Sequence, residues 1–142
     1  MAFEHQITAR FHEVDRAGIV FFNRVYEYAH ICFEEMLWEA FGPPSEVYDT
    51  ADVGFPLVHS EADYRRPIQH GDRLTIKLEV EKMSDRSVTF RYEFEGQDGL
   101  PRATVRLKHA FVSLKNFQPV PRTAEFTRGL EKVGLIPAGQ DG

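Results

Sequence analysis

Two stretches near the middle of the 142-residue chain alternate between apolar and polar residues. The apolar side chains are Leu, Ile, Leu and Val in residues 74–80, and Val, Phe, Tyr and Phe in residues 88–94. A period of two places all of them on one face of an extended chain, so each stretch predicts a β-strand with one buried face. Because a tight connection at residues 84–86 joins the two stretches, they predict an antiparallel hairpin.

Three further stretches show the same alternation less regularly. Residues 3–11 predict a strand near the start of the chain, and residues 55–66 predict one whose alternation is poor. Residues 103–115 predict a last strand. Its apolar phase slips beside His109 and Ala110, which indicates a β-bulge there.

The period changes in residues 24–41, where apolar residues recur at steps of three and four. This spacing predicts an amphipathic helix of about five turns. Asn23 is placed to cap its start, and the Gly-Pro-Pro run at 42–44 ends it. Residues 45–54 are expected to form a loop with weak helical character. A second, shorter helix is predicted after Thr123.

The order of these elements is strand, long helix, four strands and short helix. Strands joined by short turns form an antiparallel sheet, and the long helix is large enough to cover its apolar face. We therefore predict an α+β fold in which a curved antiparallel sheet wraps around a long central helix. One domain over residues 1–142 is expected, with residues 135–142 as a frayed tail.

Composition narrows the possible functions. A net charge of −5 argues against a nucleic-acid-binding protein that relies on bulk electrostatics. The single cysteine, Cys32, excludes an internal disulfide and a cysteine-based zinc site, and the six histidines lack short metal-ligand spacing. Without a secretory leader or an apolar run long enough to cross a membrane, a cytoplasmic protein with no membrane partner is expected.

One acid, Asp15, stands in an otherwise apolar segment just before the long helix. A carboxylate in such a segment is costly unless it is hydrogen-bonded or has a chemical role, and the nearby helix start offers unpaired N–H groups. Asp15 and Gly18 also form an Asp-x-x-Gly pattern that is common in loops, so a simple turn is an equally open interpretation.

This stretch resembles a known family. An Asp-x-x-Gly motif at 15–18, an aliphatic and aromatic block at 19–22, a long helix and a four-strand meander are similar to the hot-dog fold, and most similar to the 4-hydroxybenzoyl-CoA thioesterase branch of the acyl-CoA thioesterases. The Ala-Asp-Tyr-Arg-Arg-Pro run at 62–67 is a second feature of that branch. Phe22 stands where the thioesterases of the Tol-Pal envelope system often carry a histidine, which disfavours that subgroup.

The resemblance implies the hydrolysis of an aromatic or similarly bulky acyl-CoA, such as 4-hydroxybenzoyl-CoA, with CoA as part of the substrate and no further cofactor. Asp15 would be the nucleophile or the general base, and the Phe22 backbone N–H would stabilise the oxyanion beside the Gly18 turn. A homodimer or homotetramer is implied. Candidate substrate-binding residues are His30 and Glu34 for the acyl group, and Arg65, Arg66 and Arg86 for the CoA phosphates.

Other interpretations remain open. His30 and Glu34 lie one helical turn apart and could form a simple surface pair. A hot-dog hydratase or dehydratase would act on acyl thioesters through a histidine and an acid, and no such pair is evident beside Asp15. A non-catalytic acyl-CoA-binding module would share the fold and the pocket. Ser60 and Ser113 lack evident His and Asp partners, which disfavours a serine hydrolase.

Overall fold

A computed structural model of the protein describes residues 2–43 and 52–139. Its strands are β1 (Phe3–Thr8), β2 (Val53–Gly54), β3 (Leu57–Tyr64), β4 (Arg73–Met83), β5 (Ser87–Glu95), β6 (Pro101–Ala110) and β7 (Val112–Ser113). Its helices are the 3-10 turn η1 (Phe11–Glu13), the long helix α1 (Arg24–Phe41) and the short helix α3 (Ala124–Lys132).

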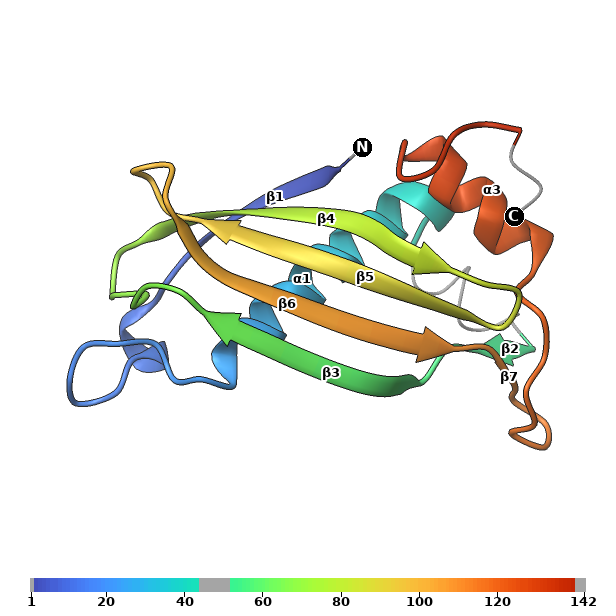
Figure 1. Ribbon diagram of the computed structural model, residues 1–142, viewed down its shortest axis with the longest axis horizontal. Helices are drawn as coiled ribbons and strands as arrows, with labels where there is room; N and C mark the ends of the chain where they lie inside the picture. Colours follow the sequence, from blue (N-terminus) through green and yellow to red (C-terminus); the bar gives the residue numbers. More distant parts are fainter. Residues whose placement is uncertain (1, 44–51, 140–142) are drawn as a thin grey trace.

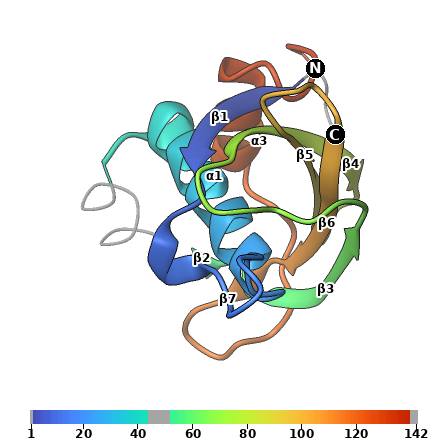
Figure 2. The ribbon, with the colours of Figure 1, turned by 90° about the vertical axis from the view of Figure 1, so that its left-hand side faces the viewer.

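Five of the strands form one antiparallel sheet in the order β1-β4-β5-β6-β3, and α1 lies across one face of it (Figure 1). Figure 2 shows the sheet curving around this helix. The predicted architecture, a curved antiparallel sheet wrapped around a long central helix, is therefore confirmed. The predicted bounds of α1 and the hairpin of β4 and β5 are confirmed as well.

The core lies between the helix and the inner face of the sheet. The alternation read from the sequence is the burial pattern of β5, where every second side chain is buried. Large side chains fill this space, and burying them removes apolar surface from water, which is the main favourable contribution to folding. The fully buried ones include Tyr28, Met36, Leu74, Ile76, Leu78, Phe90, Tyr92 and Phe94.

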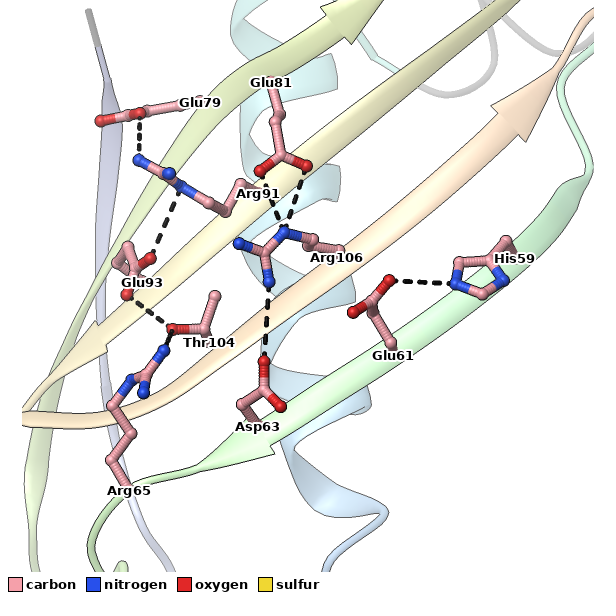
Figure 3. Close-up of polar contacts among 10 residues, drawn as sticks. All are labelled: His59, Glu61, Asp63, Arg65, Glu79, Glu81, Arg91, Glu93, Thr104 and Arg106. Atoms are coloured by element: carbon pink, nitrogen blue, oxygen red, sulfur yellow. Dashed lines mark hydrogen bonds and ion pairs between the residues drawn. The ribbon is translucent and has the colours of Figure 1, made fainter.

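The outer face of the same sheet carries charged side chains arranged in pairs (Figure 3). Arg91 lies 2.9 Å from Glu79 and 3.5 Å from Glu93. Arg106 on β6 lies 3.6 Å from Asp63 on the neighbouring β3, and 2.9 Å from Glu81 on β4, across β5. Along β4, β5 and β6 these residues alternate with the buried ones. The polar positions of the sequence pattern therefore form the solvent-exposed face of the sheet, where opposite charges are paired.

Strand β3 lies at an edge of the sheet and differs from the others. It pairs with β6 on one side, and seven of its eight side chains are exposed, among them Leu57, Val58 and Tyr64. The other edge is β1. An exposed edge strand presents N–H and C=O groups to any further strand, and β3 presents apolar side chains with them.

Several boundaries differ from the sequence-based expectation. The first strand ends at Thr8, because the chain turns into η1. The bulge expected beside His109 lies on the partner strand β3 and not on β6. Leu57 pairs with His109 and His59 pairs with Lys108, so Val58 is the extra residue. The last strand is divided at Phe111 into β6 and β7, and β7 pairs with the short strand β2.

The ends of the two helices also carry corrections. Asn23 stands at the cap position of α1 but its side chain makes no capping hydrogen bond. Thr123 does cap α3, with its Oγ1 accepting from the Phe126 N–H at 3.1 Å. Leu135 and Ile136, expected in a frayed tail, are buried in the core, so the exposed part of the tail begins at Pro137.

Most of the expected loop at 45–54 lies outside the described residues. Within the ranges that are described, no helix has both the length and the apolar character needed to cross a membrane.

Candidate active site

The loop between η1 and α1 is a small closed hairpin that holds Asp15 at its turn. The Asp15 N–H donates to the Ile19 carbonyl at 2.8 Å, and Val14 forms a bridge with Val20. The Gly18 N–H donates to the Asp15 carbonyl at 2.9 Å, and Gly18 has a φ of +79°. That left-handed conformation favours glycine, which explains the Asp-x-x-Gly spacing.

The two carboxylate oxygens of Asp15 have different environments. Oδ1 accepts hydrogen bonds from the N–H groups of Ala17 at 2.8 Å and Ile19 at 3.2 Å. Oδ2 accepts none from the residues that the structure describes. The turn interpretation is therefore realised by one oxygen, while the other remains available for a ligand or a water molecule.

The start of α1 lies beside this loop and offers free main-chain donors. The N–H groups of Phe22 and Asn23 donate no hydrogen bond to any described residue. The Phe22 carbonyl, in contrast, has a partner: the Tyr64 hydroxyl at the end of β3 donates a hydrogen bond to it. Burial raises the pKa of Tyr64, with a smaller contribution from Tyr26, so this hydroxyl stays protonated and donates.

A cavity of about 480 Å³ lies where the loop, the helix start and the end of β3 meet. Asp15 and Phe22 line it from the loop and the helix start, and Tyr64 lines it from β3. Its remaining walls are largely aliphatic. A mostly apolar cavity with a few converging polar groups is the usual form of a small-molecule site, and this volume falls within the usual range of about 300–1,000 Å³.

Two of the predicted phosphate-binding residues lie at this cavity. Arg65 and Arg66 follow β3 and both line the cavity. Arg65 also donates to Thr104 Oγ1 at 3.2 Å, and Arg66 donates to the Pro101 carbonyl at 3.1 Å. A guanidinium has five N–H donors, so each keeps donors for an anionic ligand.

The other predicted binding residues do not line the cavity. His30 Nδ1 and Glu34 Oε2 lie 2.8 Å apart on the exposed side of α1, which is the surface pair left open as an alternative. Arg86 lies in the turn between β4 and β5. That turn lies beside the last residue of β6, because Ser87 pairs with Ala110, whereas Tyr64 at the cavity pairs with Ala103 near the start of β6. For these three residues, binding of substrate stays a prediction.

Two buried titratable side chains, Cys32 and His109, lie in the core away from the residues that line the cavity. Burial raises the pKa of the Cys32 thiol to about 12, with a smaller contribution from Glu35, so Cys32 is a small buried hydrophobe as expected. His109 stacks on Phe33 with ring centroids 5.1 Å apart, and its Nδ1–H donates to the Phe55 carbonyl at 2.8 Å. Across residues 2–43 and 52–139, no three His, Cys, Asp or Glu side chains converge as a metal site would require.

Tyr64 was missed as a site residue from the sequence alone. Its run at 62–67 was recognised, but the contact of its hydroxyl with the Phe22 carbonyl joins residues 42 positions apart. A tyrosine at an exposed position of a poorly alternating strand is the signal that could have indicated it.

A five-stranded sheet curved around one helix, with an acid-bearing loop at the helix start, defines a hot-dog protein. The chain belongs to the Thioesterase-like superfamily, whose profile matches residues 9–130. The narrower 4-hydroxybenzoyl-CoA thioesterase branch is not distinguished by this match.

Among the relatives, a 1,4-dihydroxy-2-naphthoyl-CoA hydrolase of Prochlorococcus marinus strain MIT 9303 is 28% identical over 92% of this chain and 90% of its own. Its counterpart in strain NATL1A is 35% identical over 75% of each chain. The crystal structure of a 1,4-dihydroxy-2-naphthoyl-CoA thioesterase from Synechocystis matches with a TM-score of 0.83 and 22% identity, covering 92% of this chain and 96% of that chain. At that identity the structural likeness shows the fold.

Proposed function

We propose that this protein is an acyl-CoA thioesterase that hydrolyses an aromatic or similarly bulky acyl-CoA, of the 4-hydroxybenzoyl-CoA or 1,4-dihydroxy-2-naphthoyl-CoA kind, to the free acid and CoA. One observation carries the proposal. The same cavity holds a carboxylate with one unpaired oxygen, Asp15 Oδ2, and lies beside a main-chain N–H, that of Phe22, which no described residue accepts from. Superfamily membership and the relatives that act on an aromatic acyl-CoA support the reaction and the substrate class.

In the proposed reaction, the thioester carbonyl lies between Asp15 and the start of α1. Asp15 Oδ2 either attacks the carbonyl carbon to form a mixed anhydride or removes a proton from an attacking water. The Phe22 N–H stabilises the negative charge on the carbonyl oxygen, and the positive end of the α1 dipole adds to this effect. The carbon–sulfur bond then breaks, and the thiolate of CoA leaves without a strong general acid. In the nucleophilic route, water then hydrolyses the mixed anhydride, which releases the free acid and restores the Asp15 carboxylate.

The rest of the substrate follows from the lining of the cavity. Its aliphatic and aromatic walls suit a bulky apolar acyl group, which would be held by shape and burial. Arg65 and Arg66 are proposed to meet the CoA phosphates, since guanidinium groups bind phosphate oxygens through paired N–H donors. His30, Glu34 and Arg86 remain candidates, and no contact with this cavity supports them. No cofactor beyond the CoA of the substrate and a cytoplasmic location are expected.

We further propose that the protein functions as a homodimer or homotetramer. Strand β3 is an edge with exposed apolar side chains, and it ends at the cavity through Tyr64. A second copy placed along β3 would cover Leu57 and Val58 and would narrow the open side of the cavity. Sedimentation at micromolar concentration tests this, because a species of only 16.4 kDa would contradict it.

The experiment that tests the function is thiol release from a panel of acyl-CoA esters. We expect turnover of benzoyl-type and naphthoyl-type esters above that of acetyl-CoA. The second candidate is a non-catalytic acyl-CoA-binding module, favoured by the turn hydrogen bonds that Asp15 Oδ1 makes. Such a module would bind the esters and release no thiol. A hydratase would instead consume enoyl-CoA, which a change in absorbance reports.

A further inference from the structure

A buried carboxylate lies at the base of the Asp15 loop. Glu13 is the last residue of η1 and is 8% exposed. Its Oε1 accepts hydrogen bonds from the Arg10 N–H at 2.7 Å and from the Tyr28 hydroxyl at 2.8 Å. Tyr28 lies in the second turn of α1 and is fully buried. A buried carboxylate is costly without such partners, so the arrangement calls for an explanation.

The main chain of Glu13 completes the same junction. Its carbonyl accepts from the Phe21 N–H at 3.1 Å, directly before the residue whose N–H is the proposed oxyanion donor. Glu13 therefore pairs across the loop that carries Asp15, while its side chain reaches the helix. The Val20 N–H, which donates to the Ile68 carbonyl at 2.8 Å, ties the loop to the segment after β3.

We propose that the Glu13–Tyr28 hydrogen bond is a positioning contact, which fixes the Asp15 loop against α1 and so places the Asp15 carboxylate for catalysis. The inference rests on the proposed function. Glu13 and Tyr28 are absent from the residues that line the cavity, so neither is a catalytic residue.

The physical reason lies in how Asp15 is held. Both hydrogen bonds to its Oδ1 come from Ala17 and Ile19, within its own loop, so they fix its rotamer and do not themselves anchor the loop to α1. Glu13 is two residues from Asp15, and Tyr28 is on the same helix whose start carries the oxyanion donor. Burial and then the Glu13 carboxylate raise the pKa of Tyr28, so the hydroxyl donates throughout the range of an enzyme assay.

Tyr28→Phe is the direct test, because it removes the hydroxyl and keeps the buried ring. We expect kcat to fall roughly ten- to a hundred-fold, since a displacement of about an ångström has an effect of that order. KM should change less than about twofold, because the contact does not touch the substrate. Glu13→Gln keeps an acceptor oxygen for both donors and should retain most of the rate, whereas Glu13→Ala should not.

Tyr92→Phe is the matched control. Tyr92 is also fully buried, and its hydroxyl has no hydrogen-bond partner among the described residues. Its removal should leave kcat unchanged. If Tyr28→Phe and Tyr92→Phe have the same effect on kcat, the positioning role is overturned.

A double variant tests whether Tyr28 acts through Asp15. In an Asp15→Asn background the reacting carboxylate is already gone, so adding Tyr28→Phe should lower the residual rate less than about twofold. A loss as large as that in the wild-type background would show that Tyr28 acts independently of Asp15, and would overturn the proposal.

Amide hydrogen exchange separates this inference from the proposed function. In Tyr28→Phe, the amides of Asp15 and Phe21 should exchange about ten-fold faster or more, relative to any change at the core amides of β5, because the loop opens locally. If the wild-type protein hydrolyses no ester, the proposed function fails, and faster exchange at these two amides still supports the contact. Unchanged exchange at both amides overturns the inference, whether or not the protein is a thioesterase.

Discussion

Aromatic residues gather at both ends of helix α1. Around its start most of them are exposed, whereas from its middle onwards most are buried, with Trp38 (55% exposed) as the exception. At the start, Phe11 and Phe22 are 76% and 70% exposed, and Tyr64 is half exposed beside them. From the middle of the helix to its end, Phe33 and Phe126 are buried in a cluster in which most ring centroids lie 5–6 Å apart. Single exposed aromatic side chains are common on protein surfaces, whereas a group of them gathered beside a cavity indicates a binding site.

The polar groups follow the same division. At the start of α1, Asp15 Oδ2 and the Phe22 N–H have no partner among the described residues. Beside the middle of α1, His109 is enclosed by rings, and its Nδ1–H donates to the Phe55 carbonyl. One helix thus packs into a closed aromatic core along one part of its length and leaves polar groups without partners at its start. Substitutions at the two ends should therefore affect different measurements.

The largest expected effect is on turnover at the open end. Asp15→Asn keeps an oxygen that accepts from Ala17 and Ile19, so the loop should fold and the melting temperature should stay within a few degrees. The charge and basicity are lost, so kcat for thiol release should fall about a hundred- to ten-thousand-fold.

Asp63→Asn is the control for Asp15→Asn, because Asp63 is an exposed acid on the outer face of the sheet, 3.6 Å from Arg106. It should leave turnover unchanged. Near-normal turnover of folded Asp15→Asn would remove the catalytic role and leave Asp15 as a turn residue.

The matching effect at the closed end is on stability. Phe126→Ala leaves a cavity among Phe41, Phe55 and Phe111, whose ring centroids lie 5.0–6.1 Å from that of Phe126. We expect the free energy of unfolding in urea to fall by about 3–5 kcal/mol, with kcat of the folded protein retained.

Phe22→Ala is the counterpart at the open end. Its exposed ring should contribute less than about 0.5 kcal/mol to stability. An equal loss of stability in the two variants would contradict the division between the ends.

A smaller effect concerns the pH dependence of stability. Burial lowers the pKa of His109, nearby His30 adds to this, and the hydrogen bond to the Phe55 carbonyl opposes it. As the pH falls, the unfolded chain therefore binds a proton at His109 at a higher pH than the folded protein does. The contribution of His109 to the free energy of unfolding is fully present above about pH 6.5. Below that pH it should fall by up to about 1.4 kcal/mol per pH unit.

Urea unfolding between pH 7 and pH 5 measures the effect of His109. His109→Gln should flatten the slope in this range. His59→Gln should not, since His59 is exposed and paired with Glu61. Equal slopes in the wild type and His109→Gln would exclude His109 as the cause.

The smallest effect is on substrate binding. Arg65→Ala and Arg66→Ala should each raise KM for an acyl-CoA about three- to ten-fold with kcat nearly unchanged, because a phosphate contact is the same in the ground and transition states. Arg86→Ala sharpens the test. Its distance from the cavity within one chain predicts no change, and a raised KM would indicate that Arg86 reaches the site of another subunit.

The sequence predicted those parts of the fold whose pattern reflects a single buried face. Helix α1 and the hairpin of β4 and β5 were predicted because one side of each packs on the core. Strand β3 alternates poorly because an exposed edge strand buries neither face. Leu135 and Ile136 were missed, since only the folded chain brings so short an apolar pair onto the core.

The candidate site divides in the same way. Asp15, Gly18 and Phe22 lie within one short loop, so their spacing carried the information. Glu13 and Tyr28, or Phe22 and Tyr64, meet only through the fold, at separations of 15 and 42 residues. No local pattern encodes such contacts.

The single exposed edge of β3 also has a consequence for how an assembly would grow. If two copies meet antiparallel along β3 about a two-fold axis, each copy uses the edge of the other, and neither presents β3 to a third chain. Such pairing closes on itself, so it gives a finite particle and not a filament. The inserted Val58 interrupts the regular ladder of β3, and Glu61 and Asp63 add negative charge along this edge. Irregular, charged edges resist open-ended strand addition. Strand β3 would then pair with the same strand of a two-fold-related copy, and its irregular edge would disfavour the unlimited strand addition that leads to aggregation.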